Sequence, residues 1–472
     1  VLKLPAALAP IKLAVLPLVK KDGLPEKAEE IINMLRFDFR CQYDEKDSIG
    51  KRYRRQDAIG TPYCITVDHD TLKDNCVTIR FRDTMEQERV SIDKLHDIIT
   101  EKVSMKNLLN EVSRRALALF DQAIGAEQPK LYFNPQGEFK RIFEHLPQLR
   151  RKYRPTPWLA NTHAHLLYFD LIKKKTIRQQ YDQVDQLTMQ DGGITAVAWV
   201  GYDLPADTPT IVLMHTITGS LESMRELVRD LHQQTQWRIA LCLRRGHGNL
   251  PMPVPQMNLF GSTHDLREQI KFIQQQFPQS ELYAVGSSAG TGLLVRYLGE
   301  EGEQTPFKAA FALCPGYNTE LGFQHVHPFY SKVMTKKLFQ FFIQPHQDIW
   351  QNVKSLSQVL SATTLAEFEK AYFELAGFED YDSYTQAINP IYVFENVKIP
   401  LMVLNAEDDP VCHIKNLDPY KETIRKMPNI MVVTTRKGSH CGFYEGVGFT
   451  KSWASRLISN YFKVQSQLQQ AN

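Results

Sequence analysis

The sequence lacks a cysteine framework. Its 472 residues include seven cysteines, which are scattered, odd in number and never spaced as a Cys-x-x-Cys pair. A small secreted scaffold would need regularly paired cysteines, so this pattern argues against a disulfide-stabilised protein and favours a reducing compartment. We therefore expect a cytoplasmic protein.

Long apolar runs and a strong charge imbalance are also absent. No run approaches the length of about 20 residues that crosses a bilayer, and the start of the chain lacks the layout of a signal peptide. It also lacks an initiator methionine, which suggests a fragment or a processed form. The net charge of +3 is too small to indicate a nucleic-acid or membrane partner by itself. The length predicts two or more domains.

The most specific chemical signal lies in residues 282–294. An apolar run typical of a buried strand is followed at once by Gly286-x-Ser288-x-Gly290, and a helical pattern then begins. A strand, a tight turn with serine at its tip, and a helix form the nucleophile elbow of a serine hydrolase. The glycines leave room for a strained turn, and the helix N-terminus favours negative charge. Ser288 is therefore the candidate nucleophile, and the alternative is a purely structural turn.

Residues 1–111 form one compositional unit with alternating strand and helix patterns. The expected strands are residues 11–18, 63–67 and 77–81, and the expected helices are residues 25–35 and 92–103. Pro25 at a first helical turn and apolar residues at helical spacing support the first helix. This alternation predicts a small α/β domain.

A basic cluster with an aromatic residue inside it lies within this unit. It consists of Lys51, Arg52, Arg54 and Arg55, with Tyr53 among them. Such a cluster can contact phosphates and stack a base. The alternative is a solvated charged face, which is the commoner meaning of a bare run of charges.

The stretches 8–20, 49–62 and 82–90 closely resemble the C-terminal anticodon-binding domain of class IIa glycyl-tRNA synthetases. The resemblance covers about residues 1–111 and implies tRNA binding, with the four basic residues as candidate RNA contacts. The catalytic core of the synthetase, expected upstream, is not in the sequence. We therefore expect no glycyl-adenylate formation by that route.

A second pattern begins at Lys130, after a junction at residues 112–129. Strand patterns recur with helical patterns between them, at residues 210–214, 237–243, 282–285, 307–313, 400–404 and 430–434. Strands alternating with helices predict a parallel sheet covered on both faces, with its chemistry at the carboxyl ends of the strands.

Residues 317–395 interrupt this alternation with an aromatic-rich insertion, which we expect to be a cap over the active site. Two interpretations stay open for it. One is a helical subdomain with its own core, and the other is a lid that contacts lipid.

Two further groups complete a candidate triad. Asp408 and Asp409 follow one expected strand, and His440 follows the next in a glycine-flanked loop. Either aspartate could instead cap a turn or helix, and a lone histidine is often structural. The order serine, aspartate, histidine is nevertheless that of α/β-hydrolases.

Several motifs together resemble one α/β-hydrolase subgroup, which holds soluble bacterial hydrolases and, in eukaryotes, membrane-anchored lipases and phospholipases that act on acyl esters. The resemblance covers about residues 130–465. The motifs lie at residues 158–163, 191–193, 245–248, 282–290, 297–302, 406–410 and 438–445. The implied chain is an α/β protein: a small anticodon-binding-type domain (1–111), then an α/β-hydrolase domain (130–472) with a mostly parallel sheet, helices on both faces and a helical cap.

The resemblance also assigns roles. In the family pattern the triad acid directly precedes the proline-type position, which favours Asp409 over Asp408. The oxyanion hole would use the backbone N–H of Ala289 and one from the turn after residue 214, namely that of Ile217. The family usually has His-Gly where this chain has His215-Thr216, so we expect Thr216 to narrow the acyl site.

The sequence thus predicts a serine esterase or lipase that acts through Ser288, Asp409 and His440 on an acyl-ester small molecule or lipid. No metal ion or organic cofactor is implied, and membrane contact would be peripheral. The alternative is a tRNA-binding module joined to an inactive hydrolase-like domain. A third possibility is that the junction between the two segments is not natural.

Overall fold

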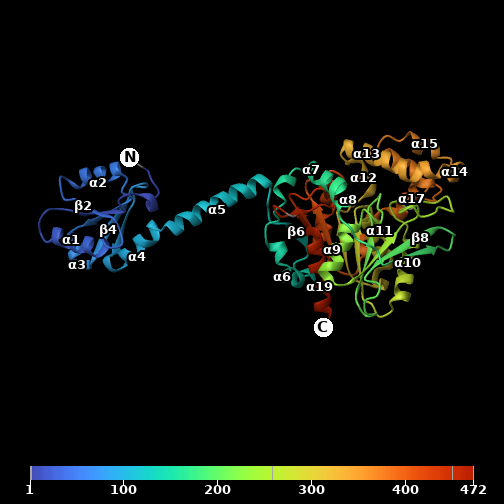
Figure 1. The fold of residues 1–472 in the computed structure, drawn as a ribbon, viewed down its shortest axis with the longest axis horizontal. Coiled ribbons are helices and arrows are strands. Elements are labelled where there is room, and N and C mark those ends of the chain that lie inside the picture. The colour runs from blue at the N-terminus through green and yellow to red at the C-terminus, as the bar shows by residue number, and fades with distance from the viewer. Residues whose placement is uncertain (1–2, 258, 449, 471–472) are drawn as a thin grey trace. The chain divides into compact units, whose positions relative to one another are not determined.

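The computed structural model describes residues 3–257, 259–448 and 450–470. It divides the chain into two compact units, Val1–Phe120 and Asp121–Asn472 (Figure 1). Each unit contains its own sheet and its own buried apolar clusters. The two are therefore described separately.

The first unit is built on a five-stranded sheet in the order β2-β1-β3-β4-β5. The strands are β1 (Leu13–Pro17), β2 (Cys41–Tyr43), β3 (Tyr63–Val67), β4 (Cys76–Phe81) and β5 (Gln87–Ser91). β1 pairs in parallel with β2 and β3, whereas β3, β4 and β5 are antiparallel. The three strands expected from the sequence are confirmed, and β2 and β5 were missed because they are short or polar.

Helices cover both faces of this sheet (Figure 1). They are α1 (Leu24–Leu35), α2 (Ile49–Ile59), α3 (Thr71–Asp74) and α4 (Ile92–Val103). The apolar stripes of α1 and α4, including Ala28, Ile31 and Leu95, pack into the main core of the unit. α2 lies on the opposite face, where Tyr53 packs against Cys64 and its neighbours.

The second unit contains a nine-stranded sheet in the order β6-β14-β13-β12-β11-β9-β10-β8-β7. The six central strands are parallel, whereas β6 pairs antiparallel with β14, β8 pairs antiparallel with β10, and β7 pairs antiparallel with β8. The strands are β6 (Lys130–Phe133), β7 (Gln183–Thr188), β8 (Ile194–Val200), β9 (Thr210–Met214), β10 (Arg238–Leu243), β11 (Leu282–Ser287), β12 (Phe307–Leu313), β13 (Leu401–Ala406) and β14 (Ile430–Thr435). All six strands expected from the sequence belong to the parallel part, which confirms a mostly parallel sheet.

Two apolar layers sandwich this sheet. On one face, α9 (Arg225–Thr235) and α19 (Trp453–Gln470) pack together and contribute Val228, Leu457 and Tyr461. On the other face, α10 (Thr263–Gln276) and α11 (Ala289–Glu301) contribute Ile270 and Leu294. Helices thus bury both faces of the sheet. Because the six central strands are parallel, their carboxyl ends lie at one edge of it.

The insertion between β12 and β13 is a helical cap with its own core. Its helices are α12 (Thr319–Gln324), α13 (Pro328–Leu338), α14 (Gln347–Trp350), α15 (Leu356–Ser361), α16 (Leu365–Ala371) and α17 (Tyr381–Ile388). Trp350, Leu365 and Phe368 are fully buried there and pack with Met257 and Leu259 from the loop after β10. The dense aromatic residues of the insertion are thus mainly core residues, which favours the first of the two interpretations of the cap.

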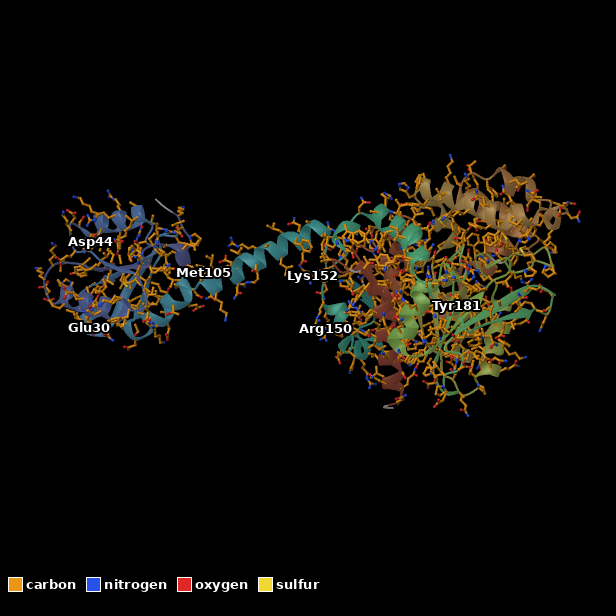
Figure 2. The ribbon with its side chains drawn as sticks, viewed as in Figure 1. Glu30, Asp44, Met105, Arg150, Lys152 and Tyr181 are labelled. Atoms are coloured by element: carbon orange, nitrogen blue, oxygen red, sulfur yellow. The ribbon has the colours of Figure 1, made fainter. Side chains whose placement is uncertain are left out.

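The segment that joins the two units in sequence is one long helix, α5 (Met105–Ile124). Side chains project from it along its length (Figure 2), and Met105 at its start is 46% exposed. Near its other end, the carboxylate of Asp121 accepts from Lys152 at 3.0 Å. The expected junction, residues 112–129, begins inside this helix. Among the described residues, no helix is both long and apolar enough to cross a membrane.

Candidate active site

The elbow after β11 has the strained geometry that a nucleophilic serine requires. Ser288 has φ 52° and ψ −118° and stands between β11 and the start of α11. A Cβ atom on Gly286 would lie 2.6 Å from the carbonyl oxygen of Gly290. A Cβ atom on Gly290 would lie 2.4 Å from that of Met214. Only glycine fits at both positions, so the turn requires the two glycines of the Gly-x-Ser-x-Gly pentapeptide.

Ser288, His440 and Asp409 form one continuous hydrogen-bonded chain. The Nε2 atom of His440 lies 2.8 Å from the Oγ of Ser288, and its Nδ1 lies 2.8 Å from the Oδ2 of Asp409. All three side chains are buried. Burial opposes a charged ring, but the carboxylate of Asp409 raises the pKa of His440 well above its ordinary value. The arrangement can therefore take a proton from the serine and stabilise the resulting imidazolium.

The two adjacent aspartates have different surroundings. The other carboxylate oxygen of Asp409, Oδ1, accepts the N–H groups of Val411 and Cys412, which fixes the carboxylate against the ring. Asp408 instead accepts the N–H of Ser439 at 2.9 Å and pairs with the hydroxyl of Thr162. Asp408 therefore holds the loop that carries His440 without contacting the ring.

The two expected oxyanion donors lie beside the serine. Ile217 and Ala289 line the same cavity as Ser288. Neither backbone N–H has a hydrogen-bond partner among the residues that the structure describes. Both are therefore available to a negatively charged oxygen that forms next to Ser288.

The cavity at Ser288 is apolar and small, with a volume of about 70 Å³. Phe323, Val326 and Met334 of the cap close one side of it, and Phe260 and Val411 come from loops of the main body. Thr216 does not line this cavity. It lines a separate cavity of about 30 Å³ together with Ser287, Glu226 and Cys441. Thr216 is thus not among the residues that could narrow the cavity at Ser288, which counts against the expectation that it narrows the acyl site.

A buried histidine that the sequence did not single out supports the loop of His440. His165 of α7 (Thr162–Leu167) donates from Nδ1 to the carbonyl oxygen of Leu159 and accepts the N–H of Tyr444 at Nε2, at 3.0 Å. A side chain on Gly442 would collide with this ring. Burial lowers the pKa of His165 to about 4, so the ring is neutral and suited to accept that N–H.

Three cysteines lie around His440. Cys314 and Cys441 place their sulfur atoms within 4.8 Å of each other and of a ring nitrogen of His440. Asp409, Cys412 and His440 form a second such group. Both groups share the ring that hydrogen-bonds to Ser288, so a metal ion there would compete with the serine for His440. No metal-dependent step is assigned to either group.

A buried ion network explains two of the sequence motifs. The guanidinium of Arg245 donates to both Asp191 and Asp265, with distances of 2.7–2.8 Å. A Cβ atom on Gly193 would lie 2.4 Å from this guanidinium. Asp191 therefore pairs with Arg245, and Gly193 leaves room for its guanidinium. These contacts fix the loop after β10.

The four basic residues expected to contact RNA are not equivalent. Lys51 and Arg54 are exposed on α2. Arg55 is half-exposed and ion-pairs with Asp44 and Asp47. Arg52 is 2% exposed and donates to the backbone carbonyl oxygens of Pro17 and Leu18. Arg52 is thus a structural residue in this arrangement, and its expected role as a phosphate contact is wrong, because its side chain is buried and both terminal nitrogens of its guanidinium already donate to backbone carbonyl groups.

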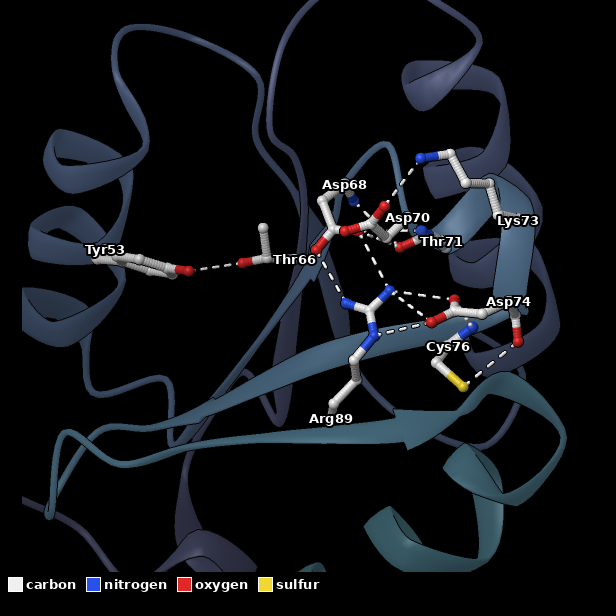
Figure 3. Close-up of polar contacts among 9 residues, drawn as sticks. All are labelled: Tyr53, Thr66, Asp68, Asp70, Thr71, Lys73, Asp74, Cys76 and Arg89. Carbon is white, nitrogen blue, oxygen red and sulfur yellow. Dashed lines mark hydrogen bonds and ion pairs between the residues drawn. The ribbon is translucent and has the colours of Figure 1, made fainter.

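Tyr53, the aromatic residue of this cluster, also has contacts within the first unit. The hydroxyl of Tyr53 hydrogen-bonds to Thr66 at 2.6 Å (Figure 3), and the guanidinium of Arg80 lies 4.7 Å from the centre of its ring. Figure 3 also shows Arg89 bridging Asp68 and Asp74. These contacts tie α2 to β3 and tie β5 to the turn after β3.

Two family models match the chain. The model described as anticodon binding domain matches residues 12–102, and the model described as alpha/beta hydrolase fold matches residues 209–447. The second match covers half of the chain and includes Ser288, Asp409 and His440.

Individual relatives divide in the same way. The chain is 26% identical over 353 residues to embryogenesis-associated protein EMB8 of Picea glauca, covering 70% of this chain and 76% of that protein. It is 27% identical over 338 residues to phospholipase ABHD3 of Bos taurus, covering 68% and 80%. It is 61% identical over 103 residues to a glycine–tRNA ligase of Alkaliphilus metalliredigens, covering 22% of each chain. The chain thus spans about a fifth of that ligase.

Proposed function

Because this chain belongs to the alpha/beta hydrolase fold family and carries an anticodon-binding domain ahead of the hydrolase domain, we propose that it is a serine hydrolase of carboxylic esters. Its substrates carry an apolar acyl group, and the reaction passes through an acyl-enzyme on Ser288. The observation that carries this proposal is the hydrogen-bonded chain from Ser288 through His440 to Asp409.

The first half of the reaction acylates the serine. His440 takes the proton of Ser288 as its Oγ attacks the ester carbonyl carbon, and Asp409 stabilises the imidazolium. The carbonyl oxygen becomes an oxyanion, which accepts hydrogen bonds from the N–H groups of Ala289 and Ile217. The tetrahedral intermediate collapses, the bond to the alkoxy oxygen breaks, and His440 gives its proton to the leaving alcohol.

The second half frees the enzyme. A water molecule gives its proton to His440 and attacks the acyl carbon, and a second tetrahedral intermediate forms in the same oxyanion hole. Its collapse releases the carboxylic acid, and the proton returns from His440 to the Oγ of Ser288. Every proton in this cycle passes through His440, and the cycle as proposed needs no metal ion or organic cofactor.

The apolar lining of the cavity at Ser288 supports an apolar acyl group. One relative is a phospholipase, which is consistent with a lipid substrate. The test is hydrolysis of a series of esters that differ only in acyl chain length, with Ser288→Ala as the control. We expect turnover by the wild type and a loss on the order of 10³-fold or more in Ser288→Ala. Equal rates for the two proteins would refute the proposal.

A second proposal concerns the first unit, which we infer to bind tRNA through the exposed side chains of Lys51 and Arg54. The match to the anticodon binding domain supports it, as does the exposure of these two residues. The full chain should bind tRNA with an affinity that falls steeply as salt rises. Replacing both residues by alanine should weaken binding and flatten the salt dependence, whereas unchanged binding would count against this surface.

A further inference from the structure

Two buried side chains contact the backbone carbonyl groups of the turn that carries the oxyanion donor Ile217. The guanidinium of Arg244 donates to the carbonyl oxygen of His215 at 3.0 Å and to that of Thr216 at 2.8 Å. The Nε2 atom of His247 lies 2.9 Å from the carbonyl oxygen of Ile217. Three successive carbonyl groups are thus fixed, and all three are held by the residues that follow β10.

The contact with Thr216 has a direct consequence for the oxyanion hole. The carbonyl of Thr216 and the N–H of Ile217 belong to one planar trans peptide group, in which they point in opposite directions. By holding the Thr216 oxygen on its own side, Arg244 aims the N–H of Ile217 at the opposite side. Ile217 lines the cavity at Ser288, and its N–H has no hydrogen-bond partner among the described residues.

Arg244 is also a buried cation without a carboxylate partner. It is 3% exposed, and no carboxylate among the described residues lies within ion-pairing distance of it. The next residue, Arg245, is paired with two aspartates. Burial lowers the pKa of Arg244 to about 9, and the guanidinium stays charged at neutral pH. Burial and the nearby Arg244 lower the pKa of His247 to about 3.

An unpaired buried charge is costly, and proteins normally pair it or leave it at the surface. We propose that Arg244 is a positioning residue for the oxyanion hole, and that the oxyanion of the tetrahedral intermediate is its missing counter-charge. The cation acts through the peptide group of Thr216 and Ile217, which it orients and polarises. Its charge stabilises the transition state more than the neutral ester, so the effect falls on the chemical step.

This inference rests on the proposed esterase function and deepens it. The test uses the full chain, Arg244→Met and Arg244→Lys, and two inhibitors with the same apolar chain. A trifluoromethyl ketone forms a charged tetrahedral adduct with the serine, whereas the matching alcohol stays neutral and unattacked. In Arg244→Met, kcat and affinity for the trifluoromethyl ketone should both fall on the order of tenfold to a hundredfold. KM and affinity for the alcohol should not change, and Arg244→Lys should retain part of the effect.

Arg238 provides a matched control. It lies at the other end of β10, is fully buried, and donates to the carbonyl oxygens of Thr208, Leu204 and Pro205. It has no carboxylate partner in the part of the chain that the structure describes. Arg238→Met should lower stability but leave the ratio of the two inhibitor affinities at the wild-type value.

Three outcomes would overturn the inference. One is an equal loss of affinity for both inhibitors in Arg244→Met, and another is the same selective loss in Arg238→Met. If Arg244→Met fails to fold, Arg244→Lys decides the matter, and a wild-type kcat together with a wild-type ratio of the two inhibitor affinities in that variant is the third. A wild type that neither hydrolyses esters nor reacts with the trifluoromethyl ketone would instead reject the proposed function, and this inference with it.

Discussion

At the scale of single residues, the difference between Asp408 and Asp409 is the most direct consequence of the site geometry. Asp409 contacts the ring of His440, and Asp408 contacts the backbone of the loop that carries it. Asp409→Asn should lower kcat by about 10⁴-fold, because the amide would favour the wrong imidazole tautomer.

Asp408→Asn should lower kcat far less and act mainly on stability, since one acceptor of the N–H of Ser439 is retained. Steady-state kinetics of the two variants, with thermal unfolding measured alongside, separate these effects. A larger loss of kcat in Asp408→Asn would transfer the role of the triad acid to that residue.

A second residue makes stability depend on pH. Glu369 of the cap is buried, accepts from the hydroxyl of Tyr381 at 2.9 Å, and has one oxygen without a partner among the described residues. Burial raises its pKa from 4.5 to about 7. The folded protein therefore binds this proton more tightly than the unfolded chain does.

The free energy of unfolding should then fall as pH rises from about 4.5 to 7, by on the order of 3 kcal/mol, and stay low above that. Glu369→Gln keeps a polar group without the charge and should lose this part of the pH dependence. Chemical denaturation at several pH values checks it, and parallel pH profiles for the two proteins would disprove the assignment.

Sequence reasoning at this scale found the residues that have a fixed place in a motif. Ser288, Asp409 and His440 each follow a strand, so their order along the chain was informative. Arg244, His165 and Cys314 were missed as parts of the site. They are buried and contact backbone groups, and neither property leaves a pattern in the sequence. Arg52 was misjudged for the same reason, since a buried arginine and an exposed one look alike in a basic run.

At the scale of elements, α12 and α13 of the cap contribute Phe323 and Met334 to the wall of the cavity at Ser288, which we propose as the acyl site. Phe323 of α12 lines this cavity and packs against Phe260, with ring centres 4.9 Å apart. Phe323→Ala should enlarge the cavity and improve kcat/KM for longer acyl chains, with a gain of at most about 0.8 kcal/mol for each additional buried methylene.

Thr216→Ser is the matched control, because the side chain of Thr216 lines the other cavity. The measurement is kcat/KM across acyl chain lengths for both variants. The same shift in both, or in Thr216→Ser alone, would show that the cavity at Ser288 is not the acyl site.

The regular elements were largely predictable, and the irregular ones were not. Strand β12 is a nearly continuous apolar run and helix α4 has apolar residues at helical spacing, and the expected bounds of both agree with the structure. The edge strand β7 is mostly polar, with half-buried and exposed positions in alternation, and the start of α9 follows a turn whose leucine and methionine already fit a helical spacing. In these places tertiary contacts decide the structure, and periodicity alone misleads.

At the scale of the whole molecule, each unit has its own core, so we expect the two to fold independently. The exposed stretch of α5 has little packing to protect it, and an isolated helix of that length is marginal in water. Limited proteolysis should therefore cut first within residues 111–128 and leave two resistant fragments. Protection of this stretch, with earlier cuts inside either unit, would contradict independent folding.

The measurement that bears most directly on the proposed chemistry is covalent labelling of the serine. A fluorophosphonate reacts with a serine only where a neighbouring base and an oxyanion hole activate it. Intact mass should show one label on the wild type, fragment masses should place it on Ser288, and Ser288→Ala should take none. A wild type that stays unlabelled, or a label that persists in Ser288→Ala, would mean that Ser288, His440 and Asp409 do not form a working nucleophile.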